Sequence, residues 1–179
     1  DVCSSDLNVK SNSFSSLLYY HKEMLNFHTS LTEKHTYQAN PWSWLVMGRP
    51  TSFYYQSPKG CGVKDCAKEV LAIGTPILWW LGAIAVLFLI GVNLHHIAMR
   101  EFDSAAVIPM LGIIAGYLPW FFFQKRTVFT FYAIVFEPFM ILTLVLMAKM
   151  AYEYDERFKY LIGIAVLIIA INFIDFYPL

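Results

Sequence analysis

The sequence is poor in charged residues and has no excess of either sign. Asp, Glu, Lys and Arg make up 15% of its 179 residues, against about 25% in an average soluble domain. The 13 basic residues balance the 13 acidic ones, so there is no electrostatic reason to expect a nucleic-acid partner. Hydrophobic residues reach 58%, above the roughly 45–50% of soluble domains. The composition therefore favours an integral membrane protein.

A secretory signal is also absent from the start of the sequence, because residues 1–35 contain no basic segment followed by an apolar one. A polar segment outside the cytoplasm has to be exported, so we expect the N-terminal part of the protein to be missing. Residues 1–7, DVCSSDL, match the translation of a common sequencing adapter. We interpret them as an assembly artefact and give Cys3 no role. The alternative is a genuine loop start.

Long apolar runs begin at Val70 and are separated by short charged connections. A helix needs about 20 apolar residues to cross the hydrocarbon core of a bilayer, and inside lipid its backbone has to bond within the segment. We therefore predict four transmembrane helices, at residues 70–94, 105–123, 129–150 and 160–176. Small residues within these runs, including the single GxxxG pair Gly112 and Gly116, are expected to permit close helix contacts.

Residues 8–69 form a polar segment that is too rich in aromatic rings for a disordered tail. Apolar residues recur at three- and four-residue steps in residues 12–34, which predicts an amphipathic helix. Its apolar stripe suits either the membrane surface or the helix bundle. Residues 35–50, HTYQANPWSWLVMGRP, predict an ordered loop over the mouth of the bundle. The predicted fold class is an all-α integral membrane protein, with a four-helix module at residues 70–179.

Charge bias does not decide the orientation. If both ends lie outside, the inner loops hold Arg100, Lys149, Arg157 and Lys159, and the outer side holds Lys59, Lys64, Lys68, Lys125 and Arg126. Two other observations favour residues 8–69 lying outside the cytoplasm. Trp79, Trp80 and Trp120 then share the outer interface. Cys61 and Cys66 are also spaced to close a small disulfide loop in an oxidising compartment.

Two free thiols are the alternative for Cys61 and Cys66. A metal site is not expected there, because two thiolates leave a tetrahedral ion half coordinated.

Three separated blocks resemble bacterial protein O-mannosyltransferases. Residues 20–55, YHKEMLNFHTSLTEKHTYQANPWSWLVMGRPTSFYY, are similar to the last large extracytoplasmic loop of that family. Residues 70–82, VLAIGTPILWWLG, are similar to the start of its C-terminal four-helix membrane module, and residues 124–141, QKRTVFTFYAIVFEPFMI, to its next recognisable block. The sequence departs from the family at Thr36, where relatives often have proline, and at Ala39, where they often have serine.

The resemblance implies a multi-pass cell-membrane enzyme of the GT-C architecture. Such enzymes transfer mannose from a polyprenyl-phosphate (dolichyl-type) donor to Ser or Thr of secreted or membrane proteins. The family's catalytic carboxylate lies in a first extracytoplasmic loop that this sequence does not contain. No catalytic residue is therefore expected here, and this part would bind the donor lipid and support the fold without a cofactor or metal. The alternative is a non-enzymatic multi-pass protein, such as a transporter half or a scaffold subunit.

Arg126 is the first candidate for binding the donor phosphate, because a guanidinium binds phosphate bidentately. The alternative is an interfacial arginine that anchors a helix end. Arg49 is the second candidate, against a loop arginine bonded to backbone carbonyls. Candidate donor or acceptor contacts, for which loop packing is the alternative, are His35, His28, Trp42 and Trp44.

Glu137 is the only carboxylate deep within a predicted span, and Pro138 follows it. An intramembrane carboxylate suggests a functional site. We expect a structural ion pair or hydrogen bond to another helix, at a kink caused by Pro138.

Overall fold

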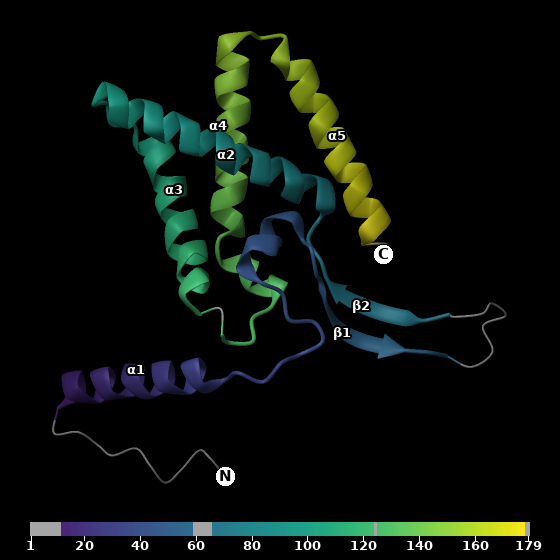
Figure 1. Cartoon of the computed structure of the whole chain (residues 1–179). Coiled ribbons are helices and arrows are strands. Elements are labelled where there is room, and N and C mark those ends of the chain that lie inside the picture. The colour runs from purple at the N-terminus through teal and green to yellow at the C-terminus, as the bar shows by residue number, and fades with distance from the viewer. Residues whose placement is uncertain (1–11, 59–65, 124, 178–179) are drawn as a thin grey trace.

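A computed structural model describes residues 12–58, 66–123 and 125–177 (Figure 1). The interpretation of residues 1–7 lies outside the described residues, as do Cys3 and Cys61. Most of the described chain is helical, and the one sheet is a two-stranded hairpin.

Four α-helices form a bundle, and their bounds are α2 (Pro76–Met99), α3 (Ser104–Tyr117), α4 (Glu137–Tyr154) and α5 (Phe158–Phe176). Helix α4 contacts the other three, and α2 crosses it obliquely in Figure 1. Helix α3 continues into the 3₁₀ helix η2 (Leu118–Phe123). Figure 1 shows that α3, α4 and α5 run alternately down, up and down, and the connections after α2 and α4 are short.

Three helical stretches of the described chain are long and apolar enough to cross a membrane: Pro76–Met99, Ser104–Phe123 and Phe158–Phe176. Helix α4 is not among them, because its 18 residues include Glu137, Lys149 and Glu153. The predicted mostly helical, multi-pass membrane architecture is confirmed. A fourth crossing by α4 remains a prediction.

The first predicted span begins later than expected. Residues 70–72 belong to a strand, and α2 starts at Pro76. Proline suits the first turn of a helix because its φ angle is already helical and its missing N–H has no partner to lose there. The apolar character of residues 70–72 thus marked a strand and not the start of the membrane helix.

The third predicted span is divided, which corrects the expectation for Glu137. Residues 129–150 were predicted as one helix, whereas the structure has the 3₁₀ helix η3 (Thr130–Val135) followed by α4. Glu137 is the first residue of α4 and Pro138 lies in its first turn. Pro138 therefore starts the helix instead of kinking it, and Glu137 lies near the end of the bundle, not deep within a span.

A β-hairpin was not predicted. Strand β1 (Thr51–Gln56) pairs antiparallel with β2 (Lys68–Ala72), with Thr51 opposite Ala72. The signal was present, because TSFYYQ is mostly β-branched and aromatic, the residue types that favour strands.

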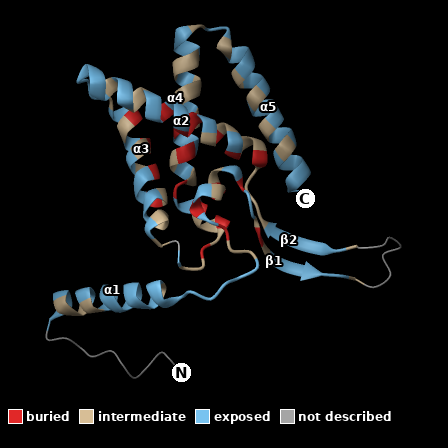
Figure 2. Cartoon of the chain, viewed as in Figure 1, coloured by how far each residue is buried: buried red, intermediate tan, exposed pale blue. Residues whose placement is uncertain are grey.

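The amphipathic helix is confirmed as α1 (Ser13–Ser30), shorter at its C-terminal end than predicted. Asn12 caps it by accepting a 2.8 Å hydrogen bond from the Ser15 amide. Helix α1 lies across one end of the bundle and has no buried residue (Figures 1 and 2).

The buried residues form one cluster that extends from the 3₁₀ helices η1 (Pro41–Val46) and η3 along α2 and α3 and into the start of α4 (Figure 2). Helix α5 has no buried residue. Its exposed apolar side chains suit contact with lipid or with another part of a larger protein.

Candidate functional site

The polar segment and the connection after α3 meet at one end of the bundle. The Ala39 amide donates to the Val128 carbonyl over 2.9 Å, and the Tyr117 hydroxyl donates to the Pro41 carbonyl over 2.8 Å. The Trp79 indole donates to the Trp44 carbonyl over 2.8 Å. These bonds seat residues 39–44 on the bundle, so the predicted loop over its mouth is confirmed.

Arg126 lies at this end, just after η2. Its guanidinium is 5.9 Å from the ring centroid of Trp120 and 5.7 Å from that of Tyr132, within cation–π range. The two rings stack on each other at 4.7 Å with an interplanar angle of 5°. The Nε atom of Arg126 is buried and has no hydrogen-bond partner. Aromatic faces thus hold the cation, while its donor capacity is not fully used.

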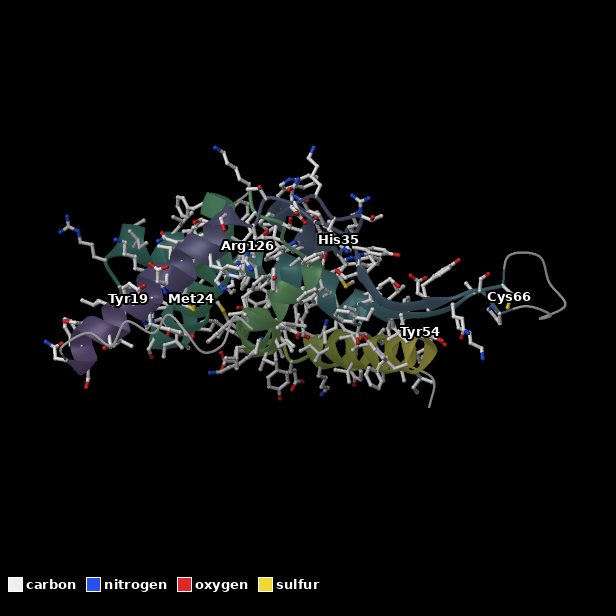
Figure 3. The ribbon with its side chains drawn as sticks, turned by 90° about the horizontal axis from the view of Figure 1, so that it is seen from below. Tyr19, Met24, His35, Tyr54, Cys66 and Arg126 are labelled. Carbon is white, nitrogen blue, oxygen red and sulfur yellow. The ribbon has the colours of Figure 1, made fainter. Side chains whose placement is uncertain are left out.

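A pocket of about 390 Å³ separates α1 from η2, and Arg126 lines it. One wall is lined by residues of α1, namely His21, Met24, Leu25, His28 and Thr29. The other wall is lined by Pro119, Trp120 and Phe123. Figure 3 views this end from below, with α1 crossing it and Met24 beside Arg126. Most of the lining is apolar, so an anion carried on an apolar chain fits the chemistry of this pocket.

The two histidines of the pocket differ in their bonding. The Nδ1 atom of His21 lies 2.8 Å from the Leu17 carbonyl oxygen and donates to it. The Nδ1 atom of His28 is buried and has no partner. An unpaired buried polar atom costs free energy. His28 and Arg126, which line the same pocket, each have one such atom.

Arg49 does not share this pocket. Its side chain is exposed, and its carbonyl accepts a 2.6 Å hydrogen bond from the Thr130 hydroxyl. It is not among the residues that line the space around Arg126. The expectation that Arg49 and Arg126 reach the same phosphate therefore finds no support in this arrangement.

His35 belongs to a turn. Its Nδ1 atom accepts a 3.2 Å hydrogen bond from the Tyr37 amide, and its ring packs edge-on against Phe129 with centroids 5.3 Å apart. These contacts match the structural alternative for a loop histidine. The ring is exposed, so a contact with donor or acceptor stays a prediction.

The two loop tryptophans have opposite environments. Trp44 is completely buried, its indole donates to the Ala39 carbonyl over 3.0 Å, and its ring lies edge-on to Trp120 at 5.6 Å. The prediction that Trp44 contacts a ligand directly is therefore wrong for this structure, because no part of its ring reaches a surface. Trp42 is 66% exposed and keeps its candidate role as a prediction.

Glu137 lies in a second pocket, of about 460 Å³, near the starts of α2 and α4 and the end of α5. Among the described residues the one ion pair is Lys149–Glu153 at 3.7 Å, so the expected partner of Glu137 is not found in this part of the chain. Tyr177 lines the same pocket and donates to the Ile73 carbonyl. Burial raises the pKa of the Tyr177 phenol, and the charge of Glu137 raises it further.

Within the described ranges, no three His, Cys, Asp or Glu side chains are grouped so that they could hold a metal ion. Cys66 is disulfide-bonded. Pairing with Cys61 stays a prediction, because Cys61 lies outside the described residues.

Some residues that line the Arg126 pocket or contact Arg126 were not singled out from the sequence. Trp120 was expected only as part of an aromatic belt, and His21 and Tyr132 were given no role. One signal was available. His21 and His28 are seven residues apart, which places them on one side of a helix, with Met24 between them.

Comparisons with known proteins agree on one family. A family model described as the "C-terminal four TMM region of protein-O-mannosyltransferase" matches residues 13–179. A polyprenol-phosphate-mannose–protein mannosyltransferase of Corynebacterium glutamicum is 34% identical over 134 residues, which cover 72% of this chain and 25% of that protein. The protein of the same name from Mycobacterium tuberculosis is 34% identical over 133 residues, covering 71% and 24%. The chain thus spans about a quarter of the length of these curated relatives.

A solved structure has the same fold. It is that of the Saccharomyces cerevisiae protein O-mannosyltransferase Pmt1-Pmt2 complex bound to the sugar donor. Its similarity to this chain has a TM-score of 0.61 at 21% sequence identity, covering 90% of this chain and 23% of that one.

Proposed function

The chain belongs to the protein O-mannosyltransferase family, and from this we propose that it is the C-terminal, donor-binding part of an enzyme that mannosylates exported proteins. The resemblance of the three sequence blocks is confirmed by the family match over residues 13–179. Two bacterial relatives are named polyprenol-phosphate-mannose–protein mannosyltransferases. The proposed reaction moves mannose from a polyprenyl phosphate to a Ser or Thr hydroxyl of a secreted or membrane protein.

Arg126 is the residue proposed to bind the donor phosphate. Transfer breaks the bond between the sugar C1 atom and a phosphate oxygen, so negative charge grows on the phosphate as it leaves. A guanidinium fixed in advance in a mostly apolar pocket stabilises that charge more than water does. The carrying observation is that Arg126, whose Nε is buried and unpartnered, lines a pocket with mostly apolar walls.

The acceptor hydroxyl has to lose its proton as its oxygen attacks C1, which requires a general base. We assign that base to a carboxylate in a segment outside this chain, and we expect these 179 residues alone to be inactive. This part then supplies the lipid-phosphate site and the helices that hold it.

The donor site is proposed to open on the outer face of the cell membrane, with residues 8–69 outside the cytoplasm. Arg126, the loop of residues 39–44 and α1 lie at one end of the bundle, which supports a single face for donor and acceptor. The family match over residues 13–179 and the names of the bacterial relatives favour the enzyme over the non-enzymatic alternatives, a transporter half or a scaffold subunit.

The test uses the full-length enzyme in membranes and compares Arg126→Gln with Arg157→Gln. Arg157 is exposed in the turn between α4 and α5, at the other end of the bundle. Loss of charge-assisted hydrogen bonds is expected to lower donor-dependent mannose transfer about 10- to 100-fold in Arg126→Gln. Arg157→Gln should retain transfer. Normal transfer kinetics in a correctly folded Arg126→Gln protein would reject the phosphate role.

A further inference from the structure

Helix α1 carries histidines where its apolar face is expected. A surface helix usually turns its apolar side chains toward the protein and its polar ones away. On the side of α1 that lines the pocket with Arg126, His21 and His28 flank Met24 and Leu25. The charged residues Lys22 and Glu23 lie outside that lining. His21 bonds to its own helix through the Leu17 carbonyl, whereas Nδ1 of His28 has no partner. His28 is therefore the ring of this pair that lacks a polar partner.

His28 and Arg126 line one pocket, and each has a buried nitrogen atom without a hydrogen-bond partner, although they are almost 100 residues apart in the sequence. The buried atoms are Nδ1 of His28 and Nε of Arg126. Both are donors when the imidazole carries its proton at Nδ1, and the Arg126 guanidinium has no acceptor atom. Met24, Leu25 and Phe123, which line the same pocket, have no side-chain nitrogen or oxygen to pair with them. A ligand that satisfies both must bring acceptor oxygens, and the positive charge of Arg126 favours an anion.

We propose that His28 is a second phosphate contact, so that the phosphate of a phosphorylated lipid is held between α1 and Arg126. The hydrocarbon nearest the phosphate then lies against Met24, Leu25 and Phe123. Assigning this lipid as the mannosyl donor rests on the proposed function above. A phospholipid headgroup has the same phosphate chemistry, so the experiment has to distinguish these two sources.

Packing alone does not explain why α1 lies against this end of the bundle, and binding of a phosphate gives the helix a function there. The helix has no buried residue, and the chain after it is tied to the bundle by a 3.3 Å hydrogen bond from the Thr127 amide to the Leu31 carbonyl. Thr127 directly follows Arg126, so this bond sets α1 opposite the arginine. Helix α1 thereby forms one wall of the phosphate site, and η2 with Arg126 forms the other.

The experiment measures polyprenyl-phosphate binding to the full-length enzyme in phosphatidylcholine nanodiscs, together with donor and acceptor KM. His28→Phe keeps an aromatic ring and removes both nitrogens. It is expected to weaken binding and raise donor KM about tenfold, the effect of losing one hydrogen bond to a charged group. Acceptor KM should not change. His28→Asn places an amide N–H near the position of Nδ1 and should restore most of the affinity, which a purely structural role would not predict.

His95→Phe is the matched control, because His95 is exposed near the C-terminal end of α2, at the opposite end of the bundle. Competition with polyprenol, which lacks the phosphate, should have little effect. Competition with phosphatidic acid separates the two sources: weak displacement assigns the site to the donor, and full displacement supports a phosphate site open to bulk phospholipid.

Parent-like affinity in His28→Phe, with weakened binding in Arg126→Gln, would overturn the second contact and leave the proposed function standing. Unchanged affinity in both variants would reject the proposed role of Arg126 as well.

Discussion

At the scale of single residues, the position of Arg126 depends on two aromatic rings. Trp120 and Tyr132 stack on each other, and the guanidinium lies within 6 Å of both ring centroids. The Trp120 indole is itself fixed by a 3.0 Å hydrogen bond to the Gly116 carbonyl. Because the rings orient the cation without using up its N–H groups, they leave it able to bind an anion.

Replacing Trp120 with leucine should loosen Arg126 without removing its charge. A cation–π contact is worth about 0.5–2 kcal/mol, so donor KM of the full-length enzyme should rise roughly 2- to 30-fold while acceptor KM stays unchanged. Trp80→Leu is the control, since Trp80 is half exposed and lies outside the Arg126 pocket. Equal donor KM in the two variants would show that the aromatic platform does not position the arginine.

Trp44 should matter for stability and not for ligand contact. Its ring is fully buried between Tyr117, Trp120 and Tyr132. Truncation of a buried tryptophan to alanine typically costs about 3–5 kcal/mol, so Trp44→Ala should markedly lower the thermal unfolding temperature in detergent. Trp42→Ala removes a mostly exposed ring and should change stability by roughly 0.5 kcal/mol or less. Similar unfolding temperatures for the two variants would contradict the packing.

At the scale of elements, α3 approaches α4 through glycines. A Cβ atom on Gly112 would lie 2.2 Å from the Phe139 ring, and one on Gly116 would lie 3.0 Å from the Phe136 Cβ. The GxxxG pair therefore has the role expected of small residues in membrane helices, because only hydrogen fits at Gly112 and a Cβ at Gly116 would be tight. The close contact also sets the start of α4 against the end of α3. The connection that contains Arg126 begins at this end of α3.

Gly112→Ala should separate α3 from α4. Overpacking of this kind costs about 1–3 kcal/mol, even though alanine favours a helix over glycine by roughly 1 kcal/mol. Gly163→Ala is the matched control, since nothing lies within 4 Å of a Cβ placed there in α5. Thermal unfolding in detergent should show a loss for Gly112→Ala and no loss for Gly163→Ala. An unaltered Gly112→Ala protein would mean that the helices do not pack this closely.

At the scale of the whole molecule, the connections lie at two opposite ends. The Lys125–Arg126 turn, the loop of residues 39–44 and the start of α2 share one end. The turn between α4 and α5 lies at the other end, as Figure 1 shows. If the bundle spans the membrane, these two turns face opposite sides, and the proposed donor site requires the first to be outside.

Single cysteines at Lys125 and Glu156 should report this orientation. A membrane-impermeant maleimide added to intact cells is expected to label Lys125→Cys at once and Glu156→Cys only after permeabilisation. The parent protein measures any labelling of its own cysteines, of which Cys66 is disulfide-bonded. Labelling of Glu156→Cys alone in intact cells would place Arg126 in the cytosol and reject the donor site.

The apolar runs after Val70 by themselves determined that the chain forms membrane helices. Lipid offers no hydrogen-bond partner, so the backbone of a long apolar run must bond within itself. The periodic stripe of α1, the ordered loop and the family resemblance were also evident from local sequence. The stripe and the loop depend only on residues close together in the sequence. The resemblance depends on three sequence blocks that follow one another in the same order as in the family.

Tertiary structure alone decided where the polar groups meet. It placed Glu137 at the start of α4, paired β1 with β2, buried Trp44 and brought His28 to the pocket of Arg126. Local periodicity carries no information on which distant segments pack together. That choice follows from the shapes of side chains far apart in the sequence, such as Trp120 on Tyr132 and Gly112 on Phe139, and only folding brings them into contact.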